Sequence, residues 1–129
     1  MYLKRIQWVR MKLAIIGSRG IMMENLEKYL PDCVDEIVSG GAKGIDGCAA
    51  AYARKKGIKL TEFFPEYQKY GRAAPLRRNE TIAEYADEAI AFWDGKSRGT
   101  KYTVEAFHKL GKRVKVIIVK DGSKKGEQI

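Results

Sequence analysis

Histidine, cysteine and long apolar runs are all scarce in this chain. It has one histidine and two cysteines among 129 residues, and Cys33 and Cys48 belong to no Cys-x-x-Cys pair or Cys/His cluster. This argues against a metal site such as zinc, and isolated thiols are typical of reduced cysteines in the cytoplasm. No apolar stretch approaches the ~20 residues of a membrane helix, and the first residues lack the apolar core of a signal peptide. We therefore expect a cytoplasmic protein that neither spans nor binds a membrane.

Positive charge is in moderate excess. The 25 Lys and Arg residues outnumber the 16 Asp and Glu residues, for a formal net charge of +9. Residues 1–10 contribute +3 and residues 120–129 contribute +1, which leaves +5 for residues 11–119. This balance favours an anionic partner, but it is that of a mildly basic domain rather than of a polybasic arm.

Short apolar runs alternate with amphipathic stretches along the chain. The runs predict five strands, at residues 12–16, 36–39, 59–64, 88–93 and 114–119. The stretches between them predict four helices, at residues 22–30, 45–56, 75–86 and 102–110. Strands separated by helices imply a parallel sheet with right-handed crossovers. The predicted fold is a three-layer, Rossmann-like α/β sandwich with a five-stranded parallel sheet.

The ends of the chain differ from its middle. Met11 directly precedes the first strand, so residues 1–10 are interpreted as an N-terminal extension and residues 11–119 as one domain. The polar residues 120–129 predict a disordered tail.

The first candidate ligand loop is Gly17-Ser18-Arg19-Gly20, directly after the first strand. In parallel α/β sheets, ligands bind at the carboxyl ends of the strands. Glycines let the backbone approach a ligand, and Arg19 can add a charge-assisted bond to a phosphate. The alternative is an ordinary tight turn between a strand and a helix.

A second loop follows the second strand and opens the next helix. It contains Gly40, Gly41, Ala42, Lys43, Gly44 and, two residues later, Asp46. The first N–H groups of a helix have no partner within it and attract anions, which favours a phosphate-bearing ligand here. Asp46 either accepts a bond from a ribose hydroxyl or stabilises the first helical turn. The loop is not a Walker A motif, because Lys43 precedes the last glycine.

A third candidate lies in the helix predicted at residues 75–86. Asn79 falls near the centre of the apolar face that we assign to Leu76, Ile82, Ala83 and Ala86. A polar amide in such a place requires hydrogen bonds, either to a ligand or to the loops that it braces. Arg78 flanks this face and is a candidate ligand contact, whereas Arg77 points away.

The fourth candidate is the loop after the fourth strand, from Trp93 to Thr100. Ser97 and Thr100 can cap the following helix or bind a phosphate, and Trp93 can stack on a base or close the core. Asp94 and Gly99 complete this group of site candidates. Basic residues gather in these loops and helix starts, at Arg19, Lys43, Arg72, Arg77, Arg78, Lys96, Arg98 and Lys101.

No catalytic set is recognisable from residue spacing. The chain contains no Ser/His/Asp arrangement and no close pair of carboxylates. His108 and Glu105 both point away from the apolar face of the helix predicted at 102–110. The sequence therefore leaves open whether the protein is an enzyme.

Taken together, the stretches IIGSRG, VSGGAKGID, RRNETIA and WDGKSRGT resemble the SLOG superfamily. The resemblance covers residues 12–119 and is strongest to the small YspA/YpsA-related (DUF2493-type) branch. It implies a sheet order of 3-2-1-4-5 and a nucleotide-derived ligand. The matching motif positions are Gly17, Ser18, Arg19, Gly40, Gly41, Gly44, Asp46, Arg78, Asn79, Ser97, Gly99 and Thr100.

The superfamily also includes families with other activities. The DNA-processing protein A family binds single-stranded DNA, and its GSR, SG-x-A-x-GID and RN motifs are all present here. The cytokinin-activating phosphoribohydrolases carry PGGxGTxxE, whereas this chain has SRGTKYTVE, with Glu105 two places later.

The leading expectation is a small-molecule partner: a nucleotide or nucleotide derivative, bound for sensing. The alternatives are a phosphoribohydrolase-like enzyme that cleaves an N-glycosidic bond and a weak single-stranded DNA-binding module. The chain is either a monomer or a homo-oligomer.

Overall fold

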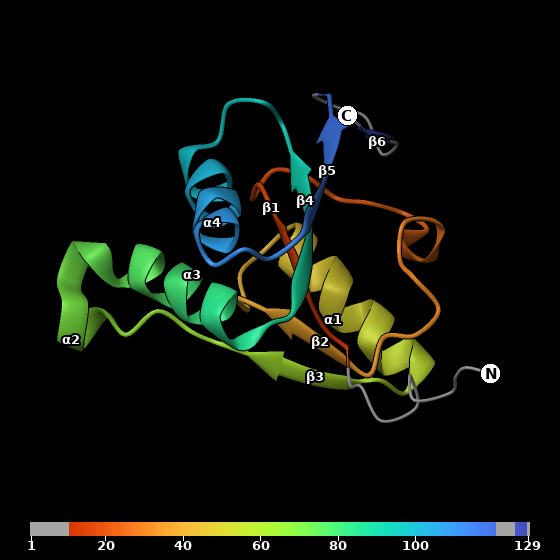
Figure 1. The fold of residues 1–129 in the computed structure, drawn as a ribbon, viewed down its shortest axis with the longest axis horizontal. Coiled ribbons are helices and arrows are strands. Elements are labelled where there is room, and N and C mark those ends of the chain that lie inside the picture. Colours follow the sequence, from red (N-terminus) through yellow and green to blue (C-terminus); the bar gives the residue numbers. More distant parts are fainter. Residues whose placement is uncertain (1–10, 121–125, 129) are drawn as a thin grey trace.

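A parallel sheet of five strands runs through the centre of the protein (Figure 1). The computed structural model describes residues 11–120 and the backbone of residues 126–128. The sheet order is β3-β2-β1-β4-β5-β6, and only β6 pairs antiparallel. The strands are β1 (Lys12–Gly17), β2 (Glu36–Ser39), β3 (Lys59–Glu62), β4 (Glu88–Trp93), β5 (Val114–Val119) and β6 (Gly126–Gln128). The predicted fold class and the order 3-2-1-4-5 are confirmed.

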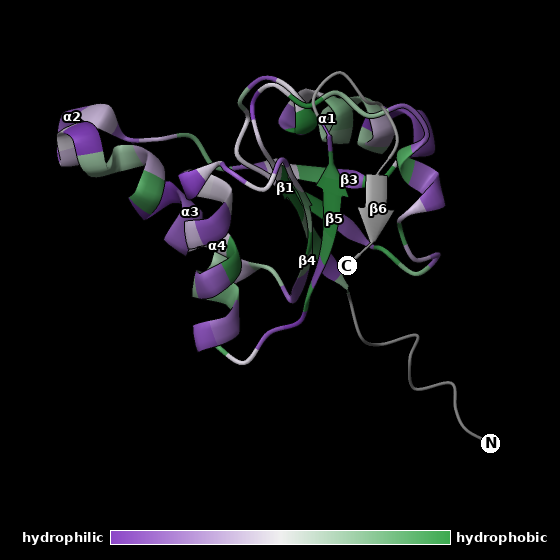
Figure 2. Cartoon of the chain, turned by 90° about the horizontal axis from the view of Figure 1, so that it is seen from above, coloured by the Kyte–Doolittle hydropathy of each residue, from purple (hydrophilic) through white to green (hydrophobic). Residues whose placement is uncertain are grey.

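Helices cover both faces of this sheet and make three layers (Figures 1 and 2). The four α-helices are α1 (Ile45–Lys56), α2 (Tyr67–Tyr70), α3 (Ala74–Tyr85) and α4 (Arg98–Lys109). Two 3-10 turns, η2 (Leu26–Lys28) and η3 (Gly71–Ala73), complete the order. The helix α1 packs on one face of the sheet with the segment around η2, and α3 and α4 pack on the other.

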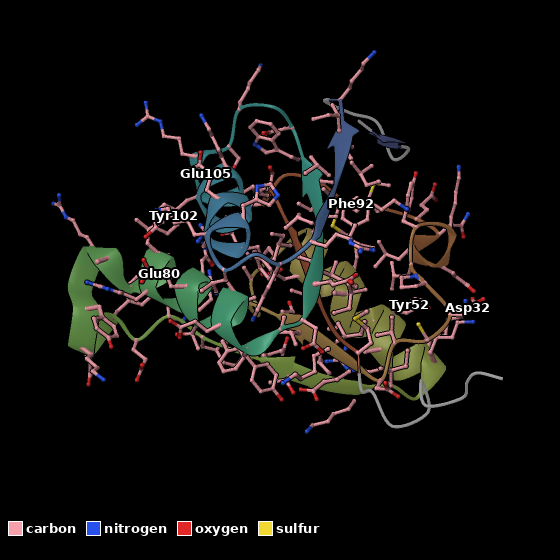
Figure 3. The ribbon with its side chains drawn as sticks, viewed as in Figure 1. Asp32, Tyr52, Glu80, Phe92, Tyr102 and Glu105 are labelled. Atoms are coloured by element: carbon pink, nitrogen blue, oxygen red, sulfur yellow. The ribbon has the colours of Figure 1, made fainter. Side chains whose placement is uncertain are left out.

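Apolar side chains on both faces of the central strands hold these layers together. Leu13 and Ile15 of β1 pack toward α1, whereas Ala14 and Ile16 pack toward α3 and α4. Phe92 (Figure 3) is fully buried. Its ring meets that of Tyr29 edge-on, with 5.5 Å between the ring centroids. Strands buried on both faces explain why the sequence shows continuous apolar runs rather than alternation.

The helix predicted at residues 22–30 is wrong, because only the single turn η2 forms there. Asn25 has φ 28°, outside the helical region, and interrupts the segment. Ile21, Met23 and Leu26 are nevertheless buried, so the segment contributes to the core as an irregular strap. Its buried positions do not have helical spacing, which removes the packing reason for a helix.

Several predicted boundaries also shift. The predicted helix at 102–110 begins four residues earlier, because Ser97 is its N-cap and α4 starts at Arg98. The long connection at residues 65–75 contains α2 and η3. The third strand ends at Glu62 rather than at residue 64.

The disordered tail predicted for residues 120–129 is wrong in part, because β6 forms at its end. The backbone of residues 126–128 pairs with β5, and this pairing supplies hydrogen bonds to an edge that would otherwise stay open. Residues 121–125 and 129 lie outside the described residues, as does the proposed extension 1–10.

One lysine fixes the end of α3 and so the helix that carries Arg78 and Asn79. Lys112 Nζ donates to three backbone carbonyls at that end, those of Ala83 (2.8 Å), Glu84 (2.8 Å) and Ala86 (2.7 Å). The last carbonyls of a helix have no partner within it, and a cation there also complements the helix dipole.

We predict that Lys112→Met lowers the free energy of unfolding by about 1–3 kcal/mol, because three carbonyls lose their charged donor. Urea denaturation followed by circular dichroism measures the change. Lys109→Met, at an exposed position in α4, is the control and should stay within about 0.5 kcal/mol of the wild type. Equal stability of the two variants would contradict the capping role.

Candidate functional site

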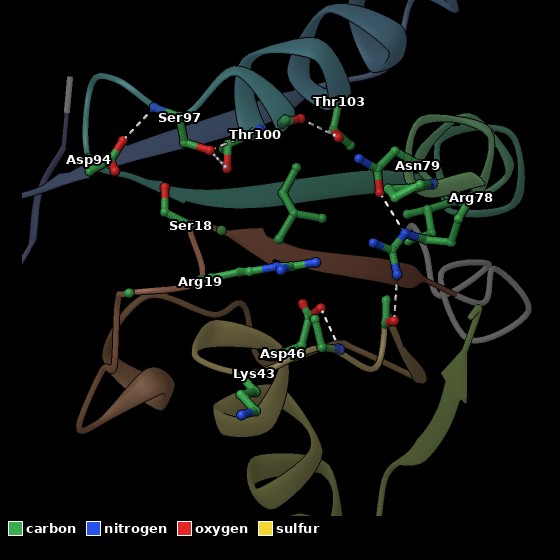
Figure 4. Close-up of a pocket in the computed structure, with 18 residues that line it drawn as sticks. Ser18, Arg19, Lys43, Asp46, Arg78, Asn79, Asp94, Ser97, Thr100 and Thr103 are labelled. Atoms are coloured by element: carbon green, nitrogen blue, oxygen red, sulfur yellow. Dashed lines mark hydrogen bonds between the residues drawn. The ribbon is translucent and has the colours of Figure 1, made fainter. Parts of the chain in front are cut away.

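A cavity of about 350 Å³ opens at the carboxyl ends of the parallel strands (Figure 4). It lies where the chain leaves β1 toward η2, β2 toward α1 and β4 toward α4, the place at which α/β sheets bind ligands. The predicted site residues that line it are Gly17, Ser18, Arg19, Gly40, Ala42, Lys43, Asp46, Arg78, Asn79, Asp94, Ser97, Gly99 and Thr100. The structure thus brings together all of the predicted residues except Gly41, Gly44 and Trp93.

Gly20, the last residue of the first candidate loop, also lines the cavity. Four further residues line it that the sequence reasoning did not select, namely Ile16, Pro75, Ile82 and Thr103. Ile82 was assigned to the core, and Thr103 lies one turn beyond Thr100 on the same face of α4. Helical spacing therefore contained the signal for Thr103.

The start of α4 forms one wall of the cavity. Ser97 caps the helix, because its Oγ accepts the Thr100 N–H at 3.5 Å. The Asp94 carboxylate accepts the N–H groups of Ser97 (2.7 Å) and Lys96 (2.8 Å), and these bonds hold the pKa of Asp94 below its ordinary value. Helix geometry leaves the N–H groups of Arg98 and Gly99 without a partner inside the helix.

Ser18 lines the cavity next to this wall, and its hydroxyl is buried without a hydrogen-bond partner among the described residues. The residue is only 5% exposed, and its Oγ has no hydrogen-bond partner among the described residues. The hydroxyl lies close enough to Asp94 to help lower the pKa of that carboxyl, but it lacks the geometry of a hydrogen bond. Figure 4 shows it beside the loop of Asp94 and Ser97. A buried hydroxyl in this condition costs free energy until something bonds to it.

The glycine-rich loop forms the other wall, and its own carboxylate holds it. Asp46 Oδ2 accepts the Ala42 N–H at 3.0 Å, and Ser39 Oγ accepts the Gly41 N–H at 3.4 Å. Burial raises the pKa of Asp46, although the Ala42 N–H and the Arg78 charge oppose this shift. Asp46 thus braces the loop that precedes α1 rather than the first helical turn, and a bond to a ribose hydroxyl stays a prediction. Two of the loop's donors, at positions 41 and 42, already have partners within the protein.

Gly44 has a structural reason to be glycine. Its φ is +72°, and a Cβ atom there would lie 2.3 Å from the carbonyl oxygen of Arg19. The first turn of α1 therefore packs directly on the Gly17–Gly20 turn, an approach that only glycine permits. This contact, rather than exposure to the cavity, explains the residue.

Arg78 and Asn79 of α3 close the third side. Arg78 Nη1 donates to the carbonyls of Gly40 (2.5 Å) and Phe63 (3.3 Å), and its Nε donates to Asn79 Oδ1 at 2.7 Å. Burial lowers the pKa of Arg78, and the nearby Asp46 carboxylate opposes this shift. Arg78 therefore braces the ends of β2 and β3, while Asn79 is half-buried and lines the cavity.

Trp93 lies away from the cavity. Its Nε1 donates to the Ser97 carbonyl at 2.9 Å, and its ring lines a separate cavity of about 400 Å³ beside α4 and β5. Neighbouring residues of a strand point to opposite faces of the sheet. Phe92 packs on the face of α1, so Trp93 lies on the face of α3 and α4. Leu76 also departs from its prediction, since it lies at the edge of the apolar face of α3 and is 39% exposed. Arg77 points outward as predicted and pairs with Glu80 at 3.4 Å.

The described side chains of the cavity combine three cations with two carboxylates. Arg19, Lys43 and Arg78 oppose Asp46 and Asp94. Figure 4 shows Arg19 extended across the cavity between Ser18 and Asp46. Within residues 11–120, no three His, Cys, Asp or Glu side chains gather as a metal site. His108 and Glu105 are both exposed on α4, as the helical phase predicts.

No family model, curated protein or solved structure matches the chain. The resemblance to the SLOG superfamily therefore stays a prediction. In the part of the chain that the structure describes, no helix has the length and apolar character needed to cross a membrane.

We predict that Arg78→Leu lowers the free energy of unfolding by about 1–3 kcal/mol, because two carbonyls lose their donor and Asp46 loses its neighbouring cation. Arg77→Leu is the matched control: it removes only an exposed ion pair and should cost less than about 1 kcal/mol. Chemical denaturation of both variants measures the difference. If the two costs are equal, Arg78 does not brace the loops.

Proposed function

We propose that the protein binds a phosphate-bearing nucleotide or nucleotide derivative in the cavity between β1 and β4, as a domain of the SLOG type. The observation that carries this proposal is the buried Ser18 hydroxyl, which has no partner among the described residues and faces the start of α4. A phosphate oxygen placed there would accept its proton.

Three groups supply the attraction for a phosphate at this position. The start of α4 offers unpaired N–H groups and a dipole worth about 0.3–1 kcal/mol toward an anion. Arg19 reaches across the cavity and can add a charge-assisted hydrogen bond. The Gly40–Gly44 loop is the weaker candidate, because Asp46 already bonds to one of its N–H groups and Ser39 to another.

The size of the cavity limits what it can hold. Ligand pockets span roughly 300–1,000 Å³, so about 350 Å³ suits a sugar phosphate or a mononucleotide rather than a dinucleotide. Asp46 and Asp94 lie across the cavity and can accept bonds from sugar hydroxyls through carboxylate oxygens that face it.

Binding is favoured over hydrolysis of an N-glycosidic bond. Such an enzyme needs a carboxylate aimed at the substrate, and only Asp46 and Asp94 line the cavity among the described residues. Both already accept backbone N–H bonds that hold the loops. Glu105 is exposed on the outer side of α4 (Figure 3). A sensor or carrier role therefore suits these residues better than catalysis.

We predict that nucleoside monophosphates, or related nucleotides such as ADP-ribose, raise the melting temperature, since a ligand that binds only the native state stabilises it. At 100 times Kd the stabilisation is about 2.7 kcal/mol. Differential scanning fluorimetry with a nucleotide panel makes the measurement. If no member of a broad panel moves the melting temperature, the proposal fails.

Variants sharpen this test. Ser18→Ala should leave the unliganded protein as stable or more stable, because it removes a buried hydroxyl without a partner, yet it should reduce the nucleotide shift. Asn79→Leu should reduce the shift more than Arg77→Ala does, because Asn79 lines the cavity and Arg77 does not. Equal effects of the last two variants would contradict the assigned orientation of α3.

Salt dependence separates a small ligand from single-stranded DNA. Each neutralised phosphate of a single strand contributes about −0.7 to the log–log salt slope. We predict a shallow slope for a mononucleotide, and weak oligonucleotide binding with a steep slope that is lost near physiological salt. Fluorescence titrations across salt concentrations give both slopes. Submicromolar oligonucleotide affinity at physiological salt, without competition by mononucleotides, would favour the DNA-binding alternative instead.

A further inference from the structure

We propose that the base of the bound nucleotide lies outside the main cavity, in a second depression across Arg78, where it stacks on Phe64. This inference rests on the proposed function and specifies its ligand: a nucleotide whose sugar phosphate occupies the cavity and whose base occupies the depression. Phe64 is not among the predicted site residues, because the sequence places it at the end of the strand predicted at residues 59–64.

The main cavity lacks the surface that bases prefer. No aromatic side chain lines it within the described part of the chain. Its lining is made of glycines, hydroxyls, charged groups and a few aliphatic side chains, which suit a sugar phosphate. A base held there would have no ring to stack on.

The second depression has the complementary chemistry. It measures about 80 Å³ and is lined by Phe64 and Tyr70 together with Arg78 and Thr81. Arg78 lines both this depression and the main cavity, so the two adjoin at this residue. A ligand that passes over the Arg78 guanidinium therefore reaches both places.

Phe64 presents an open ring at this point. It is 60% exposed, although it is a large apolar side chain. Its ring lies on Gly41, where a Cβ atom would approach Phe64 Cε1 to 2.2 Å and where φ is +69°. Because Gly41 has no side chain, one side of the Phe64 ring can pack directly on the backbone there. The residues on either side of Gly41, Gly40 and Ala42, line the main cavity. The rest of the ring is free to cover a planar group.

The charges around the depression favour a heteroaromatic ring over a purely apolar group. Arg77 lies 5.8 Å and Lys69 5.1 Å from the centroid of Tyr70, so the cations already occupy that ring. Phe64 takes part in no such contact among the described residues, and it is the ring left for stacking. Thr81 and Glu66 supply hydroxyl and carboxylate oxygens for the polar edge of a base.

The test compares adenosine 5′-monophosphate with ribose 5-phosphate by isothermal calorimetry. In the wild type, the nucleotide should bind at least tenfold more tightly, because base–aromatic stacking contributes about a tenfold gain or more. Phe64→Ala should remove most of this advantage and leave the affinity for ribose 5-phosphate unchanged. Tyr67→Ala is the matched control, since Tyr67 is also exposed but lines neither depression nor cavity.

Phe64→Leu guards against a general loss of structure, because it keeps an apolar side chain over Gly41 and removes only the ring. It should reproduce the effect of Phe64→Ala with an unchanged circular dichroism spectrum. If the wild type binds both ligands equally, or if the Phe64 variants weaken both equally, the base site is wrong while the phosphate site stands. If the wild type binds neither ligand, the proposed function itself fails.

Discussion

The guanidinium of Arg78 is the contact on which the geometry of the cavity depends. It donates to the carbonyl of Gly40 after β2 and to that of Phe63 after β3, and thereby ties α3 to the ends of two strands. Its Nε bond to Asn79 fixes the neighbouring amide at the same time. Burial of a guanidinium is unfavourable, but these bonds and the nearby Asp46 carboxylate offset it. One side chain therefore sets the relative positions of two walls, the glycine-rich loop and α3.

Internal hydrogen bonds also make the glycine-rich loop a poorer phosphate site than the sequence predicts. An N–H group that already donates to a carboxylate cannot also donate fully to a ligand, and Asp46 occupies the Ala42 N–H. The loop thus contains its own carboxylate. Its glycines at positions 41 and 44 are explained by close contacts, with the Phe64 ring and with the Arg19 carbonyl respectively. At the start of α4 the Asp94 carboxylate bonds to the N–H groups of Lys96 and Ser97 but not to that of Gly99. We therefore place the proposed phosphate at Gly99.

The sequence predicted most of the architecture because buried parallel strands leave a strong and local signal. Runs such as 88–93 and 114–119 match β4 and β5 at both ends, and the strand-end rule places the ligand loops together before any coordinates are known. The prediction failed where tertiary contacts decide. In the segment at residues 22–30, the buried positions are set by contacts with the core and not by a helical period. The strand β6 pairs with the edge of β5, a contact that the local sequence does not reveal.

Within the site, sequence reasoning located residues more reliably than it assigned their roles. Arg78 and Asp46 were candidates for ligand contact, yet both act first on the loops, since the choice between brace and contact depends on distances that no pattern contains. The alternation of β4 could not exclude Trp93, because it sets Trp93 opposite Phe92, on the sheet face that also carries Ile16 of the cavity. Phe64 gave no signal, because its exposure follows from where β3 ends.

Ser18 links stability to the proposed function. A buried hydroxyl without a partner costs about 1–3 kcal/mol, and the nearby Asp94 carboxylate lacks the geometry to bond to it. A ligand that accepts a hydrogen bond from this hydroxyl would recover that free energy only in the bound state. The recovered free energy would then contribute to the affinity. Local rules of satisfied polarity are broken most often at functional sites. Ser18 breaks this rule inside the cavity at the carboxyl ends of the strands, which is also where parallel α/β sheets bind ligands. The unpartnered hydroxyl and the topology of the sheet therefore indicate the same site.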